Sequence, residues 1–168
     1  MTGPTASVAT AADRAELAAL RTRVFVEEQG VPAEIEQDAA DETAVHAISR
    51  DPAGRVVATG RLLVNGTTAT IGRMAAEASV RGRGHGAAVL AELHRQAVLR
   101  GVTEVELHAQ VNARRFYERA GYSAVGEVYQ EAGIDHITMR RALGEYPPGA
   151  DVTDRSVCEK TRLVRPSE

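Results

Sequence analysis

Three closely spaced glycines mark the stretch of this sequence most able to bind a ligand. Gly82, Gly84 and Gly86 stand in the run VRGRGHGAAVL (80–90), between an expected strand and an expected amphipathic helix. Glycine lets the backbone approach an anion and point successive N–H groups at it. The N-terminus of the following helix adds unpaired N–H donors and a partial positive charge. The run therefore predicts a pyrophosphate-binding turn, and a flexible connection that binds nothing is the alternative.

Two other phosphate-binding motifs do not fit this run. A Rossmann motif needs a βαβ unit and an acidic residue at the end of a following strand, and neither is found in the expected place. A P-loop needs Gly-Lys followed by Ser or Thr, and the sequence does not continue that way. The run is therefore neither of these motifs, and on its own it leaves both the phosphate-binding turn and the flexible connection open.

The composition is that of an ordinary globular protein. Hydrophobic residues make up 43% and charged residues 26% of the 168 residues, which suits one domain that buries its own core. The net charge of −3 argues against a nucleic-acid partner, because phosphate neutralisation requires a basic face. The single cysteine, Cys158, excludes an intrachain disulfide and a Cys-rich zinc site, and we expect no metal.

The sequence carries no signal for export or membrane insertion. Its first residues lack a basic segment followed by an apolar run, and no apolar stretch approaches about 18 residues. We therefore expect a cytoplasmic protein with no membrane partner.

The first half of the chain predicts one helix and four strands. Thr10 is a candidate N-cap with Asp13 as its capping-box partner, and an apolar stripe at helical spacing follows. The acidic segment 27–42 is expected to be a loop with at most a helical turn. Asn65-Gly66 is a strong hairpin signal. The expected elements are a strand at 6–9, a helix at 11–26 and strands at 44–50, 55–64 and 67–75.

The second half predicts two helices and three strands. Gly101 and Gly121 are expected to stop the helices. A right-handed crossover should place strands 67–75 and 103–109 parallel or splayed in a mixed sheet. Residues 144–168 are expected to form a flexible tail. The expected elements are a helix over GHGAAVLAELHRQAVL, a strand at 103–109, a helix at 112–120 and strands at 123–130 and 136–142. The order β-α-β-β-β-α-β-α-β-β gives an α/β (α+β) fold.

Three runs together resemble the GNAT N-acetyltransferase superfamily. Arg81-Gly82-Arg83-Gly84-His85-Gly86 matches the R-x-x-G-x-G/A turn, and GRMAAEASV (72–80) resembles that family's fourth strand. The run NARRFYERAGY (112–122) resembles its N-x-x-x-F-Y-x-x-x-G-F/Y helix. The resemblance implies a GNAT domain over 1–143, with a mixed, mostly antiparallel sheet of about seven strands flanked by helices. RTRVFVEEQGVPAEIEQD, HAQ (108–110) and EAGIDHITM (131–139) also resemble one bacterial branch of mostly uncharacterised acetyltransferases.

The resemblance implies acetyl-CoA as the acyl donor and direct attack by the amine of a small-molecule or peptide acceptor. A bulge in the fourth strand would leave a backbone N–H free for the thioester oxygen, and a plain strand is the alternative there. The implied cofactor-binding residues are Met74, Ala75, Ala76, Arg81, Gly82, Arg83, Gly84, His85, Gly86 and Asn112.

Tyr117 is the implied proton donor to the departing thiolate. A free tyrosine has a pKa of about 10 and a thiol of about 8.5, so the transfer costs about 2 kcal/mol, which positioning can supply. Core packing is the alternative, because Tyr117 also lies on an apolar helical stripe. Asn112 is expected to cap the helix 112–120 as well as contact the cofactor.

The acceptor amine must lose a proton before it attacks. This costs about 4.6 kcal/mol for an alkyl amine at neutral pH and about 1.4 kcal/mol for an α-amine, so a base matters most for alkyl amines. We select Glu36 and His136, because the resemblance places their segments on the acceptor side. Each candidate is otherwise an ordinary polar residue, and the full set is Glu28, Glu36, Asp41, His46, Glu77, His108, Glu131 and His136.

Two other functions stay open. One is an acyl-homoserine-lactone synthase, a class that shares the fold and resembles this chain in the spacing of Arg21, Phe25, Asp38, Asp41 and Arg61. The other is a CoA-binding sensor that has lost catalysis. The resemblance also allows a homodimer.

Overall fold

The computed structural model describes residues 3–144, which fall into two compact units. The first unit runs to Leu63 and includes Gly72–Leu93. The second unit holds Val64–Ile71 and the residues from His94 onward. Within residues 3–144, no helix has the length and apolar character needed to span a membrane. The predicted flexible tail lies outside the described residues, apart from its first residue.

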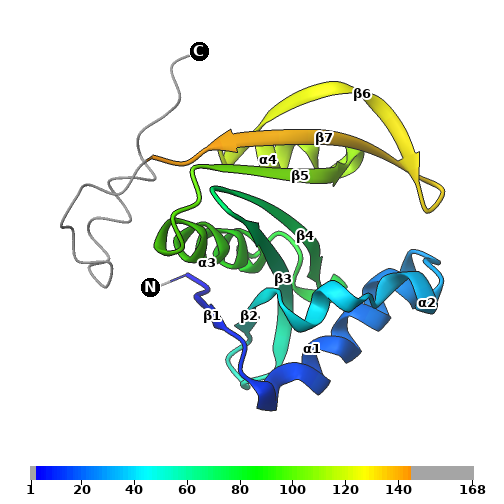
Figure 1. Cartoon of the computed structure of the whole chain (residues 1–168). Coiled ribbons are helices and arrows are strands. Elements are labelled where there is room, and N and C mark those ends of the chain that lie inside the picture. Colours follow the sequence, from blue (N-terminus) through cyan, green and yellow to red (C-terminus); the bar gives the residue numbers. More distant parts are fainter. Residues whose placement is uncertain (1–2, 145–168) are drawn as a thin grey trace. The chain divides into compact units, whose positions relative to one another are not determined.

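The first half of the chain passes from a short strand through helical turns into a meander of strands (Figure 1). Its helical elements are η1 (Ala11–Asp13), α1 (Arg14–Arg21), η2 (Thr22–Glu28), α2 (Ala33–Glu36) and η3 (Ala39–Glu42). Its strands are β1 (Ala6–Val8), β2 (Val45–Arg50), β3 (Val56–Asn65) and β4 (Thr68–Ala76).

The second half contains the longest helix and three strands. Its helical elements are η4 (Ala78–Val80), α3 (His85–Leu99), η5 (Val111–Ala113) and α4 (Arg114–Arg119). Its strands are β5 (Glu104–Gln110), β6 (Ser123–Glu131) and β7 (Ile134–Ala142). The order of strands and main helices is the predicted one.

The seven strands form one sheet in the order β1-β2-β3-β4-β5-β7-β6. The pairs β1–β2, β2–β3, β5–β7 and β6–β7 are antiparallel, whereas β4 and β5 are parallel. The parallel pairing joins Thr68–Ile71 to Glu104–Leu107 and ends there. The predicted mixed, mostly antiparallel sheet and its parallel crossover pair are therefore confirmed.

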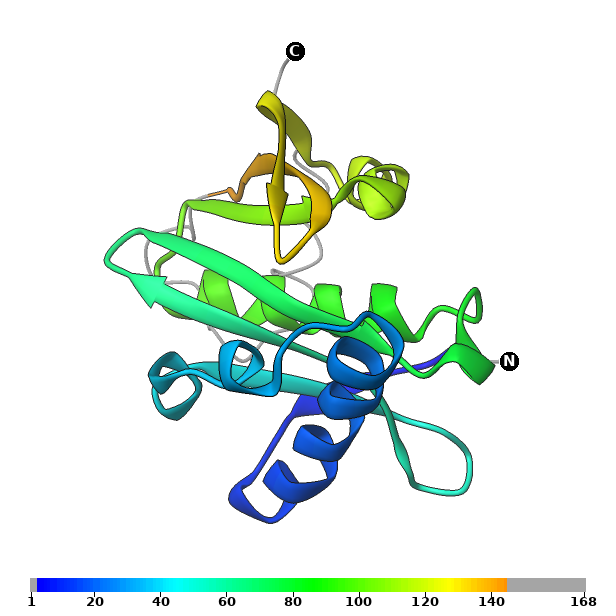
Figure 2. The ribbon, with the colours of Figure 1, turned by 90° about the vertical axis from the view of Figure 1, so that its right-hand side faces the viewer.

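The predicted helix 11–26 consists of three helical segments rather than one. Its capping box is present, since the Thr10 N–H donates to Asp13 Oδ2 at 2.8 Å. After α1 the chain widens into the π-helical turns of η2, and beyond them the Gln29 N–H reaches back to the Val24 carbonyl at 3.1 Å. Figure 2 shows α1 and η2 as one continuous coil, followed by the shorter turns of α2 and η3. The periodicity of apolar residues does not reveal such a widening, and π-helical turns are frequent at functional sites.

Two hairpin turns differ from the prediction in detail. β3 extends through Asn65, so Gly66 and the residue after it make the turn. The loop expected at 131–135 is much tighter, because both strands extend towards it and only Ala132 and Gly133 connect them. Their φ angles of 52° and 75° are those of a type I′ turn, which matches the twist of the flanking strands.

The core of the first unit lies where α1 packs on the strands. Leu20 is completely buried, and apolar neighbours from the helix and from three strands surround it. Gly60 on β3 leaves room for α3, because a Cβ there would lie 2.9 Å from Leu93 Cδ1. The cluster consists of Leu17, Leu20, Val24, Phe25, Ile48, Val56 and Ala75.

β5 in the second unit has one buried and one exposed face, whereas β6 has no buried residue. In β5 the residues Val105, Leu107 and Ala109 are buried, whereas the alternate residues Glu106 and His108 are partly or fully exposed. β7 lies between β5 and β6 (Figure 1). The registers place Glu106 and His108 of β5 on the same face as Arg140 and His136 of β7 and Tyr129 of β6.

Candidate functional site

The glycine-rich turn lies in the first unit, between β4 and α3. Gly82 and Gly84 have φ angles of 81° and 93°, a region that side chains other than glycine rarely adopt. α3 begins directly after them at His85. The predicted junction of a glycine turn with a helix N-terminus is therefore present.

The protein itself uses part of the predicted cradle of N–H groups. The Arg81 N–H faces the Ala78 carbonyl at 3.4 Å, and the Arg83 N–H donates to the Val80 carbonyl at 3.2 Å. No acceptor among residues 3–144 meets the remaining backbone donors of the turn, which belong to Gly82, Gly84, His85 and Gly86. Fewer backbone N–H groups are available for an anion than the sequence predicted, and they belong to the glycines and the first turn of α3.

Two side chains of the turn, those of Arg81 and His85, already have partners in the protein. Arg81 donates from Nε to the Ala76 carbonyl at 3.0 Å and pairs with Glu28 at 2.7 Å, so its guanidinium is tied to the protein. His85 is buried, and its Nδ1 lies 2.7 Å from Ser49 Oγ. The cofactor contact predicted for His85 therefore fits its backbone better than its side chain, whereas both the backbone N–H and the guanidinium of Arg81 already have partners in the protein.

β4 has one unusual backbone conformation, directly before the segment where we predicted a bulge. Arg73 has a φ of 52°, which is unusual for a residue other than glycine, and it directly precedes the predicted bulge at Met74, Ala75 and Ala76. Ala75 belongs to the apolar core of the first unit, so its side chain does not line a cofactor surface. The oxyanion role stays a prediction for the backbone of this segment.

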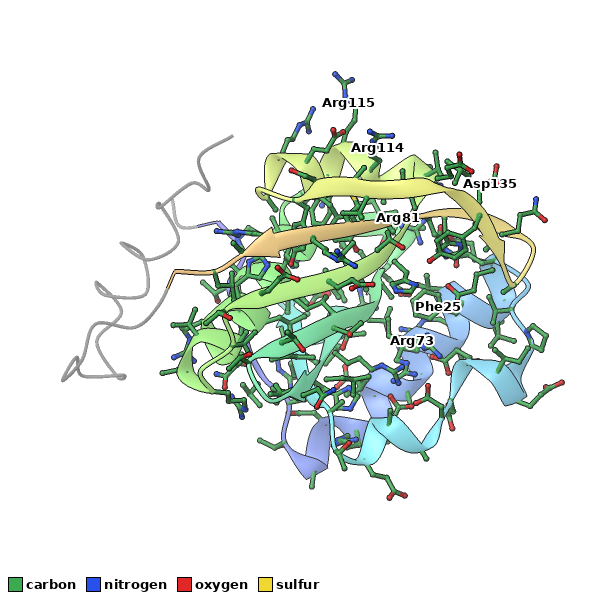
Figure 3. The ribbon with its side chains drawn as sticks, turned by 45° about the horizontal axis from the view of Figure 1, so that its top comes forward. Phe25, Arg73, Arg81, Arg114, Arg115 and Asp135 are labelled. Atoms are coloured by element: carbon green, nitrogen blue, oxygen red, sulfur yellow. The ribbon has the colours of Figure 1, made fainter. Side chains whose placement is uncertain are left out.

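Arg73 also fastens β4 to α2 and to Asp38 just beyond it. Figure 3 labels the Arg73 side chain. Its Nε donates to the Glu36 carbonyl at 3.1 Å, and its guanidinium reaches Ile35 O at 3.3 Å and Asp38 at 3.5 Å. The acidic segment that the sequence presented as a loop is therefore held by directional bonds.

A buried ion network fixes the rest of that segment. Arg21 Nε bonds Glu36 Oε1 at 2.5 Å, and Arg21 Nη1 bonds Asp41 Oδ1 at 2.8 Å. Arg61 bonds Asp38 at 2.7 Å and shares Asp41 at 2.8 Å. Burial opposes the ionised Asp41 carboxylate, but hydrogen bonds from Arg21 and Arg61 outweigh it, so the pKa of Asp41 lies well below its usual range.

This geometry favours a structural role for Glu36 over the base role that we predicted. Its side chain is 2% exposed and faces Arg21, so an acceptor amine has no clear approach to it. Removing a partner from such a buried pair leaves a charge without compensation. Nothing in the spacing of the sequence distinguished this carboxylate from the others of the acidic segment.

The predicted proton donor, Tyr117, lies in the second unit on α4. Its ring is 7% exposed and packs edge-on against Phe116 and Tyr122, with ring centroids 5.0 and 5.9 Å away. Burial raises the pKa of the Tyr117 hydroxyl above its ordinary value, which makes it a weaker acid. Tyr117 therefore packs in the core, as the alternative prediction stated. Its role as the proton donor stays a prediction.

Asn112 does not cap the helix as predicted. It lies inside the 3₁₀ turn η5, and Ala113 occupies the N-cap position of α4. Its side chain is exposed, so the predicted cofactor contact stays open.

His136 is buried, although it lies on the same face of the second unit's strands as Tyr129 and His108. Its Nδ1 donates to the Ile134 carbonyl at 2.7 Å, which leaves Nε2 as the acceptor in the neutral ring. The Tyr129 ring stacks beside it, with centroids 5.9 Å apart, and the Tyr129 hydroxyl lies 2.6 Å from His108 Nδ1. The sequence placed His108 among the base candidates but did not single out Tyr129, because their pairing depends on the strand register.

The fold and the turn define a class of protein. No cluster of three or more His, Cys, Asp or Glu suited to a metal occurs among residues 3–144. The family described as Acetyltransferase (GNAT) domain matches residues 8–143. The chain therefore belongs to the GNAT acetyltransferase family, and membership implies an acyl-CoA donor.

Three relatives illustrate the branch. The uncharacterized protein YyaT of Bacillus subtilis (strain 168) is 31% identical over 139 residues, which cover 81% of this chain and 93% of YyaT. The uncharacterized N-acetyltransferase YjcF of the same strain is 32% identical, covering 73% of this chain and 87% of YjcF. The crystal structure of an acyl-CoA N-acyltransferase from Pseudomonas aeruginosa is 32% identical with a TM-score of 0.72, covering 83% of this chain and 100% of that one.

Proposed function

We propose that this protein transfers an acetyl group from acetyl-CoA to the amine of a small-molecule or peptide acceptor, by direct attack. The observation that carries the proposal is the set of backbone donors at Gly82, Gly84, His85 and Gly86, which no acceptor in residues 3–144 meets. Hydrogen bonds to a charged group contribute about 1.5–3 kcal/mol each, so this set is sufficient to anchor a diphosphate.

Acyl transfer requires a neutral amine, a donor for the developing oxyanion and a proton for the leaving thiolate. The backbone of β4 after Arg73 is our proposed oxyanion donor, because a residue with positive φ redirects the N–H groups that follow it. Tyr117 is the proposed proton donor. Its raised pKa makes the transfer costlier than from a free tyrosine, so close contact with the thiolate is required.

The cofactor step is tested by calorimetry with acetyl-CoA and the full chain. Gly84→Val should weaken binding at least 10-fold, since a β-branched residue is strained at a φ of 93° and the turn must move. Gly54→Val is the matched control, because Gly54 has a φ of 87° in the β2–β3 turn with nothing within 4 Å of an added Cβ. Equal affinity for wild type and Gly84→Val would contradict the proposal.

The transfer step is tested by thiol release from acetyl-CoA against a panel of amines. Release with an alkyl amine or an α-amine supports an N-acetyltransferase. Release only with S-adenosylmethionine would instead support the lactone-synthase alternative, and tight binding without any release would support a sensor.

A further inference from the structure

The exposed face of β5, β7 and β6 carries three side chains arranged in series. Tyr129 Oη lies 2.6 Å from His108 Nδ1, and His108 Nε2 lies 3.4 Å from Glu106 Oε1. We propose that these three residues form the proton acceptor for the acceptor amine, with the Tyr129 hydroxyl in contact with the amine nitrogen. The inference rests on the proposed N-acetyltransferase function and names residues that this function needs.

The surroundings of His108 select one tautomer. The Glu106 carboxylate lies 3.4 Å from Nε2, and its negative charge favours the tautomer with the hydrogen on that nitrogen, so Nδ1 keeps its lone pair. The Tyr129 hydroxyl therefore donates to Nδ1. Arg140 Nε binds the other carboxylate oxygen of Glu106 at 3.2 Å and fixes its orientation.

The proton balance is simple. As the amine nitrogen releases a proton to Tyr129 Oη, the original Tyr129 proton moves to His108 Nδ1. The imidazolium that forms keeps its other hydrogen towards Glu106, whose negative charge stabilises it. The neutral amine then attacks the thioester carbon, and the C–S bond breaks to release the thiolate. The His108 side chain is 45% exposed, so the proton returns to water from Nδ1.

The register of β5 leaves the series of Tyr129, His108 and Glu106 accessible. β4 pairs with β5 only as far as Ile71 opposite Leu107, and His108 is the first residue beyond that pair. From His108 onward, β5 has hydrogen-bonded neighbours on its β7 side, where His108 faces Thr138. Tyr129 is only half-buried, so its hydroxyl is within reach of a ligand on this face.

His136 has a different task in this arrangement. Its stacking on Tyr129, at an interplanar angle of 27°, holds the phenol ring in line with His108. Its hydrogen bond to Ile134 fixes its own ring. His136 is thus a positioning residue, which replaces the base role that we predicted from the sequence. The charged and titratable groups facing Tyr129 and His108 are Glu106 on β5, Glu131 on β6, and His136 and Arg140 on β7.

The geometry is tested by nitrogen NMR of the histidine rings in the full chain, independently of any activity. Wild type should show His108 with its hydrogen on Nε2 at neutral pH. Tyr129→Phe should shift the Nδ1 resonance and the titration midpoint of His108. A hydrogen on Nδ1 in the wild type, or an unchanged Nδ1 signal in Tyr129→Phe, would overturn the proposal.

The chemical role is tested by kcat/KM against pH, with 1,4-diaminobutane as the alkyl amine and glycinamide as the α-amine. Tyr129→Phe and His108→Gln should each lower kcat/KM by about 100-fold, with a larger loss for 1,4-diaminobutane, and remove the dependence on His108 from the acidic limb of the pH profile, because a base acts only when it is unprotonated. Glu106→Gln should lower it by about 10-fold and move the midpoint to lower pH.

Two controls separate failure of this inference from failure of the proposed function. Acetyl-CoA affinity by calorimetry should be the same in all these variants as in wild type. Tyr122→Phe removes a second Tyr–His hydrogen bond, of 2.6 Å to His94, that is buried in the same unit, and it should keep the wild-type pH profile. The pH profile of an active wild type could change in His136→Gln but not in His108→Gln. That result would refute the proton-acceptor series of Tyr129, His108 and Glu106, and it would leave the acetyltransferase function intact.

Discussion

The two units of this chain hold their polar side chains in opposite ways. In the first unit, Arg21, Glu36, Asp41 and Arg61 form a network in which each charge meets an opposite charge and solvent is largely excluded. In the second unit, Glu106, His108 and Tyr129 form an open series that ends at an exposed face. The closed charge pairs leave no room for a ligand, whereas the open series presents the Tyr129 hydroxyl and the His108 ring to one. The first arrangement suits the fixing of a segment, and the second suits proton transfer.

The largest expected effect comes from opening the closed network. Arg21→Leu leaves Glu36 buried without its partner and should lower the free energy of unfolding by about 3–5 kcal/mol. Urea denaturation measures the loss. Arg23→Leu is the matched control two residues later, because Arg23 pairs with Glu77 at an exposed position and should cost less than about 1 kcal/mol. Equal losses in the two variants would show that the network does not hold the segment.

Acidification should also weaken the closed network. The folded-state pKa values of Asp38 and Asp41 are depressed by hydrogen bonds from arginines, although burial of Asp41 opposes this. Their stabilisation is therefore complete above the unfolded pKa of about 3.9 and is lost as the pH falls towards the folded values. Urea midpoints between pH 5 and pH 2 should fall steeply in wild type and less steeply in Asp41→Asn. Glu118→Gln on the surface of α4 should follow the wild-type slope.

Replacement of Tyr117 tests whether a buried group of the second unit also takes part in proton transfer. Tyr117→Phe keeps the ring against Phe116 and Tyr122, so stability should hold while kcat falls about 100-fold. Thiol-release rates and urea midpoints of the same preparation measure both quantities. Unchanged turnover at every pH would assign Tyr117 to the core alone.

The smallest expected effect concerns the buried Tyr–His pair of the second unit. Tyr122→Phe removes a hydrogen bond to His94 and should lower the free energy of unfolding by about 1 kcal/mol. Urea denaturation checks the value. If Tyr122→Phe lowered the free energy of unfolding as much as Arg21→Leu, a buried neutral pair would stabilise the fold as much as a buried charged pair. The comparison between the two units would then be wrong.

The sequence predicted most of the fold because its signals are local. Alternating apolar residues mark the strands, and Gly101, with a φ of 77°, ends α3 where it was expected. The glycine turn was likewise readable, since its positive φ angles need a residue without a side chain. The π-helical turns after α1 and the two-residue β6–β7 turn were missed, because neither changes the spacing of apolar residues.

The tertiary structure decided which polar groups meet. Glu36 and Arg21 stand 15 positions apart, and only the fold of the acidic segment buries them together. Tyr129 and His108 come from strands that both pair with β7, so their contact depends on two registers at once. A shift of one residue in either register would send the side chain to the opposite face. The chain thus encodes its turn and its strands locally, while its charge network and proton series arise only from long-range pairing.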